Sequence, residues 1–152
     1  MTDSAIAPSE GPKGIGGWLI LPMLGTILSP MINAFGIFQN IDALFKYSQK
    51  LSTTWTYFVI GETIVALAMF VAWIIAAFML FQHRRPFPIL FVSLLAATLV
   101  WNLIDVAGVV ALFGSKLVDP STIRDIVRPL IALLIWGPYM SVSKRVKNTF
   151  VN

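Results

Sequence analysis

Four long apolar stretches dominate this chain, and each is long enough to cross a membrane as a helix. They cover about residues 17–38, 55–81, 88–113 and 122–141. A helix rises about 1.5 Å per residue, so about 20 residues cross a hydrocarbon layer about 30 Å thick. Short connections make successive helices antiparallel neighbours. The sequence therefore predicts an all-α, polytopic membrane protein whose four transmembrane helices form an antiparallel bundle.

The composition disfavours a soluble helical bundle, which is the alternative fold. Of the 152 residues, 57% are hydrophobic and only 12% are charged, whereas soluble domains carry about 25% charged residues. The chain has no Cys and one His. It therefore lacks thiolate metal ligands, and one chain cannot supply both His ligands of a haem. We expect no cofactor and no metal site.

Basic residues lie at the ends of the apolar stretches, so the net charge of +4 favours a membrane over nucleic acid as partner. Two clusters are predicted to contact lipid headgroups or to set the topology. They comprise His83, Arg84, Arg85, Lys144, Arg145 and Lys147. Four spans place both termini on one side, and that side carries six of the eleven Lys and Arg residues. We expect both termini in the cytoplasm.

The segments outside the spans carry three further expectations. Residues 1–13 are polar and small, which predicts a mobile tail before a membrane domain at 14–142. A signal peptide is the disfavoured alternative for the first stretch, because the preceding segment carries Asp3 and Glu10 against Lys13. Residues 39–54 are expected to form a short amphipathic helix at the interface, or else a disordered loop. Residues 143–152 form a basic C-terminal segment.

Polar side chains inside the apolar stretches form the candidate site. Thr98, Asn102 and Asp105 share one helix face, and an acid at such depth is costly unless it faces other helices or a wet cavity. Counted from the ends of their spans, Glu62, Asp105 and Arg128 lie about 10–12 Å deep in the same half of the membrane. We expect Arg128, with Arg124, to pair with Asp105 or Glu62. The predicted cluster comprises Asn33, Glu62, Asn102, Asp105, Arg124 and Arg128, with the two asparagines completing the hydrogen bonds.

Three interpretations of this cluster stay open. In the first interpretation, the arginine–carboxylate pairs have a structural role only and fix the helix register and the choice of partner. Alternatively, the cluster can be a proton or ion site, or a polar pocket for a headgroup, with Glu62 as proton carrier if no arginine reaches it, because desolvation disfavours a charged carboxyl. The third interpretation is that the long side chains extend to the membrane surface without pairing.

Motifs at the two ends of the chain resemble a known family. The sequence GGWLILP stands at residues 16–22, and WxPY at 136–139 is followed by SKRVKNTF at 143–150. Together they resemble the YdgK-like family of small bacterial inner-membrane proteins, whose function is unknown. The resemblance covers about residues 14–150 and implies four spans in the bacterial cytoplasmic membrane, with both motifs on the cytoplasmic side. It implies no activity and no catalytic residues.

The same resemblance suggests that the two ends meet. We expect residues 143–150 to be ordered, with Val146 or Phe150 packed at the interface and Trp18 nearby. A frayed C-terminal tail is the alternative.

The sequence contains no GxSxG, Walker A, HExxH or GxGxxG motif, so we expect no enzyme. The expected function is that of an accessory or interaction subunit, which binds another membrane protein or a second copy within the bilayer. The alternative is a small oligomeric, proton-coupled carrier or channel that uses Glu62 and Asp105. An enzyme acting on lipid is least favoured, because no nucleophile–base pair is visible.

Overall fold

The computed structural model describes residues 13–47, 52–117 and 120–151, and this part of the chain contains helices but no strand. Its elements are η1 (Gly17–Leu19), α1 (Ile20–Tyr47), α2 (Thr53–Phe81), α3 (Phe87–Phe113), η2 (Ser115–Leu117), α4 (Pro120–Val142) and α5 (Lys144–Thr149). Helices α1 to α4 are each long and apolar enough to cross a membrane. The predicted all-α fold with four membrane spans is confirmed. The tail predicted at residues 1–13 lies outside the described residues, apart from Lys13.

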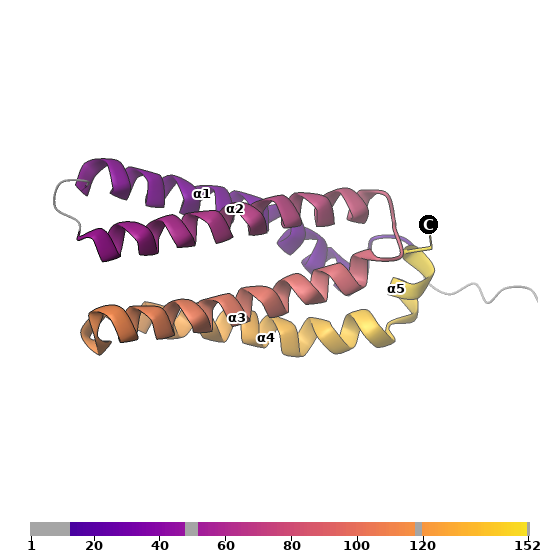
Figure 1. Cartoon of the computed structure of the whole chain (residues 1–152). Coiled ribbons are helices and arrows are strands. Elements are labelled where there is room, and N and C mark those ends of the chain that lie inside the picture. The colour runs from indigo at the N-terminus through magenta and orange to yellow at the C-terminus, as the bar shows by residue number, and fades with distance from the viewer. Residues whose placement is uncertain (1–12, 48–51, 118–119, 152) are drawn as a thin grey trace, which may run out of the picture.

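The four spans pack as two pairs. Helix α1 packs along α2 and α3 packs along α4, while fewer contacts join α2 to α3. In Figure 1 the two pairs approach each other near α5, and their backbones are further apart toward the opposite end. There, the side chains of Trp55, Phe58 and Phe113 bridge α2 and α3, with the rings of Trp55 and Phe113 stacked at a centroid distance of 4.1 Å. We call this opposite end the aromatic end.

The connection predicted at residues 39–54 differs from its prediction over residues 39–47, while residues 48–51 lie outside the described residues. Helix α1 continues without a break to Tyr47, so residues 39–47 extend the first span instead of forming a separate interfacial helix. No Pro or Gly interrupts this segment, and Lys46 forms an ion pair with Asp42 one turn earlier, with an N–O distance of 2.8 Å. The whole helix has 28 residues, which corresponds to about 42 Å. Its last turns therefore extend beyond the hydrocarbon layer.

The apolar core lies at the end of the bundle that carries α5. Leu19, Leu80 and Phe87 are fully buried there, together with Val146 and Phe150 from the C-terminal segment. The rings of Phe87 and Phe150 lie with their centroids 4.7 Å apart. The prediction that residues 143–150 are ordered and packed is confirmed, because α5 forms and buries Val146 and Phe150.

The two terminal motifs contact each other at this end. The backbone N–H of Gly14 donates a hydrogen bond to Thr149 Oγ1 at 3.0 Å, and the Thr149 hydroxyl donates to the Arg145 carbonyl at 2.7 Å. A Cβ on Gly16 would lie only 2.7 Å from Arg145 Nη1, so a glycine there permits the close approach of the guanidinium. Both ends of the described chain thus lie at one end of the bundle, as Figure 1 shows. The Trp18 side chain, which was expected nearby, is exposed.

This packing predicts a large difference between two phenylalanines. Replacing the buried Phe150 by Ala is expected to lower the free energy of unfolding by about 3–5 kcal/mol, because it leaves a cavity against Phe87. The matched control Phe38→Ala removes an exposed ring of α1 and is expected to change stability by about 0.5 kcal/mol or less. Unfolding measured in detergent micelles checks both values, and equal losses would contradict the packing role of α5.

Candidate functional site

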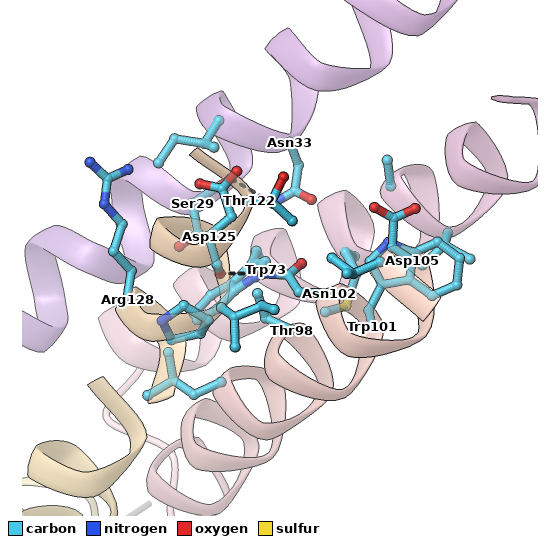
Figure 2. Close-up of a pocket in the computed structure, with 18 residues that line it drawn as sticks. Ser29, Asn33, Trp73, Thr98, Trp101, Asn102, Asp105, Thr122, Asp125 and Arg128 are labelled. Carbon is cyan, nitrogen blue, oxygen red and sulfur yellow. Dashed lines mark hydrogen bonds between the residues drawn. The ribbon is translucent and has the colours of Figure 1, made fainter. Parts of the chain in front are cut away.

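A cavity of about 520 Å³ lies between the two helix pairs, and all four spans line it. We call it the cleft. Its polar lining comes from α1, α3 and α4, as Figure 2 shows, and comprises Ser29, Asn33, Thr98, Asn102, Asp105, Thr122, Asp125 and Arg128. Helix α2 contributes apolar side chains, among them Ala66 and Trp73. The Trp73 ring packs edge-on against Phe91, with centroids 5.9 Å apart, which places the apolar core on the α5 side of the cleft.

The cleft gathers part of the predicted cluster. Asn33, Asn102, Asp105 and Arg128 all line it. Glu62 is not among the lining residues, although its carboxyl group interacts with that of Asp105. Arg124 is exposed on α4 and does not line the cleft.

The predicted arginine–carboxylate pairs do not form. In the described part of the chain, the one ion pair joins Lys46 to Asp42, and Figure 2 shows the Arg128 side chain directed away from Asp105. The register of the antiparallel helices α3 and α4 explains the error. Because Asn102 lies opposite Asp125, Asp105 faces the level of Thr122, about 9 Å along the helix axis from the level of Arg128.

Asn102 supplies a hydrogen bond that α4 cannot make for itself. In a regular helix the carbonyl of Asp125 would accept from the N–H of residue 129, but Pro129 has none. The side-chain amide of Asn102 donates to this carbonyl instead, with an N–O distance of 2.6 Å. Asn33, by contrast, donates to the carbonyl of Ser29 within its own helix, at 2.9 Å. Asn102 therefore joins α3 to α4 in the structure, which sequence reasoning from ion pairs missed. The spacing of four between Asp125 and Pro129 was the signal for it.

This contact predicts a coupling between Asn102 and Pro129. Asn102→Ala is expected to cost about 1 kcal/mol of unfolding free energy, because it leaves the Asp125 carbonyl without its donor inside a membrane span. In a Pro129→Ala background the helix supplies its own N–H, and the cost of Asn102→Ala should fall close to zero. Asn33→Ala serves as the matched control. A double-mutant cycle in detergent measures the coupling, and an equal cost in both backgrounds would contradict this role of Asn102.

Two acids meet at the membrane depth where an ion pair was predicted. Glu62 on α2 and Asp105 on α3 lie close enough for their carboxyl groups to interact. A hydrogen bond between two carboxyl groups requires a proton on one of them, because an ionised carboxylate only accepts. Asp105 Oδ1 is buried and has no hydrogen-bond partner among the residues that the structure describes. A hydrogen bond between these two acids would therefore hold one proton between them.

The sequence contained a signal for this carboxyl pair. Glu62 and Asp105 lie almost the same number of residues from the turn that joins α2 to α3. In an antiparallel pair of helices, equal distances from the turn mean equal depths. The aromatic contacts of Trp55, Phe58 and Phe113 hold α2 against α3 between the carboxyl pair and the nearby helix ends.

The two predicted basic clusters lie together at the α5 end. The Arg84 side chain donates to Gln82 Oε1 at 2.6 Å, and Arg85 Nε donates to the carbonyl of Val151 at 2.8 Å. The His83 ring lies 6.3 Å from the ring of Phe150. Helix α5 contributes Lys144, Arg145 and Lys147 to the same end. The four described acids all lie in α1 to α4 toward the aromatic end, so the described residues of the α5 end carry basic side chains and no acidic ones.

Comparisons with known proteins place the chain in context. Over residues 12–151 it matches the family described as "Protein of unknown function (DUF2569)". It is 29% identical to "Inner membrane protein YdgK" of Escherichia coli (strain K12), over 156 residues that cover 93% of this chain and 96% of that relative. No solved structure matches the chain. The resemblance to the YdgK-like family is confirmed, and the relative together with the four apolar spans supports a multi-pass protein of the inner membrane.

Proposed function

We propose that this chain, which belongs to the DUF2569 family of proteins of unknown function, is an accessory subunit that binds a membrane-spanning helix of another protein. The proposed contact surface is the cleft between its two helix pairs. The observation that carries the proposal is the polar lining of this cleft within the membrane spans, which includes Asp105 with a buried Oδ1 that has no donor among the described residues.

The chemistry of the cleft indicates what would occupy it. A polar group inside a bilayer is costly unless a protein group forms a hydrogen bond with it, because lipid chains offer none. The lining carries the carboxyl groups of Asp105 and Asp125, and the one basic lining residue, Arg128, points away from Asp105. A partner helix that presents a Lys, Arg or amide donor would therefore complement it. Small and short side chains such as Ser29 and Ala66 permit a close approach of that helix.

Little of the described chain lies outside the membrane spans, which favours a partner within the membrane. Nearly the whole described chain belongs to the four spans or to α5. Most of the helix surface is not buried inside the chain, so lipids or other membrane proteins must cover it. We propose a non-enzymatic role on the same grounds, with the basic α5 end in the cytoplasm according to the positive-inside rule.

Site-specific photo-crosslinking in native membranes tests this proposal. A crosslinking residue at Ala66, which lines the cleft, is expected to give one discrete adduct with a foreign membrane protein. The matched control is Ala68 on the same helix, which is exposed and does not line the cleft. Asp105→Leu, which removes the acceptor, should reduce the Ala66 adduct about tenfold or more, as expected for a charged hydrogen bond inside a membrane. Equal adducts from both positions would contradict the cleft as the contact surface.

A second candidate function is a proton-coupled carrier, which the carboxyl pair favours. Glu62 and Asp105 can exchange one proton next to a polar cleft. Four spans leave little room for a pathway, so this function would require an oligomer. Recovery of Ala66 adducts with only a second copy of the chain would favour this candidate over the accessory role.

Proton flux into liposomes distinguishes the carrier. If the pair carries protons, Glu62→Gln and Asp105→Asn each abolish the flux seen with the unmodified protein, because an amide does not titrate. Asp42→Asn removes an exposed acid outside the pair and should leave the flux unchanged. A flux that persists in both amide variants would rule out the carboxyl pair as the pathway.

A further inference from the structure

A second hollow lies at the α5 end, between the start of α3, the end of α4 and the C-terminal segment. It has a volume of about 330 Å³, and Arg85 and Lys147 line it. Its apolar wall consists of Pro88, Met140, Val146, Phe150 and Val151. A smaller hollow of about 210 Å³ continues along the groove between α3 and α4 and shares Pro88 and Met140 with the first. We call the part lined by Arg85 and Lys147 the cationic mouth, and the smaller hollow between α3 and α4 the apolar groove. The mouth opens into the groove, which runs along the membrane spans.

The cationic mouth has unused hydrogen-bond donors. Arg85 employs its Nε for the carbonyl of Val151, which fixes the guanidinium but leaves the donors of both terminal nitrogens available. The Lys147 ammonium contributes three more donors and is exposed. None of the described acids lies near this end of the bundle, so no carboxylate of the described chain competes for these cations.

The apolar groove has room along its length. Ile89, Val92 and Ser93 of α3 line it on one side, and Met140 and Ser141 of α4 line it on the other. The Ser141 hydroxyl already donates to the carbonyl of Gly137 at 2.9 Å, so it does not require a polar ligand. Short serine side chains on both helices leave space that an acyl chain would fill.

From this arrangement we propose that the α5 end binds one anionic phospholipid, with its phosphate on Arg85 and Lys147 and an acyl chain in the α3–α4 groove. Arginine suits this role, because its planar fork donates two hydrogen bonds to a phosphate, and lysine adds a second positive charge. The ligand must have both parts, since a free phosphate would leave the groove empty and a neutral lipid would leave the charges unbalanced. The site lies at the opposite end of α3 from Asp105 and does not depend on the proposed function of the cleft.

Lipid titration of the purified protein tests the site. Dissociation constants are measured in neutral detergent for phosphatidylglycerol, phosphatidylcholine and inorganic phosphate. The unmodified protein is expected to bind phosphatidylglycerol at least tenfold more tightly than phosphatidylcholine. The double variant Arg85→Gln, Lys147→Gln should lose roughly 30-fold in affinity for phosphatidylglycerol, because two interfacial cations are removed. Lys147→Gln alone should lose roughly fivefold, and it leaves the hydrogen bond from Arg85 to Val151 intact.

The matched control removes the same charge from the same end. Arg84 and Lys144 do not line the hollow, so Arg84→Gln, Lys144→Gln should retain nearly the full affinity. Ser93→Phe fills the apolar groove and should therefore lower the affinity for phosphatidylglycerol. The affinity for phosphatidylcholine should stay low. If both double variants lose the same affinity for phosphatidylglycerol, net charge alone explains the binding, and the proposed site is wrong. Equal affinity for inorganic phosphate, or an unchanged affinity in Ser93→Phe, would overturn the acyl-chain groove.

Discussion

The interior of a bilayer offers no water to a polar group, and this constraint governs the described structure. Each backbone carbonyl must find a donor inside the protein, and a proline removes one. Pro129 removes the donor for the Asp125 carbonyl, and the Asn102 amide from the neighbouring helix replaces it. One contact thus satisfies the backbone of α4 and sets the register of α4 against α3. That register then decides which other polar side chains can meet.

The carboxyl pair and the cleft follow from the same register. Asp105 is too far along the helix axis from Arg128 to pair with it, and it meets Glu62 of α2 instead. Two carboxyl groups satisfy each other only by sharing a proton, and one oxygen of Asp105 keeps no partner among the described residues. The polar cleft between the helix pairs therefore contains a buried acceptor that no described residue satisfies.

The opposite end of the bundle is built differently. Helix α5 folds back onto Gly14 and Gly16 near the start of the described chain. It buries Val146 and Phe150 in one core with Leu19, Leu80 and Phe87. This apolar core holds the two helix pairs together at one end and brings the two basic clusters together there. A bundle whose core lies at one end leaves the middle of its spans loosely joined, which is where the cleft lies.

The sequence by itself determined the four spans, and the family resemblance at its two ends indicated the terminal contact. These depend on apolar length, on residue counts along helices and on local motifs, and such properties are readable without tertiary contacts. The length of α1 was misjudged, because a change to amphipathic composition after Phe38 does not end a helix that lacks a breaker. Only the tertiary structure decided the partners of the polar residues. Residue counts place Glu62 and Asp105 at equal distances from their turn, but they miss the axial offset of about two helical turns between Asp105 and Arg128. The contact between Asn102 and Asp125 sets that offset, and it prevents the predicted ion pair.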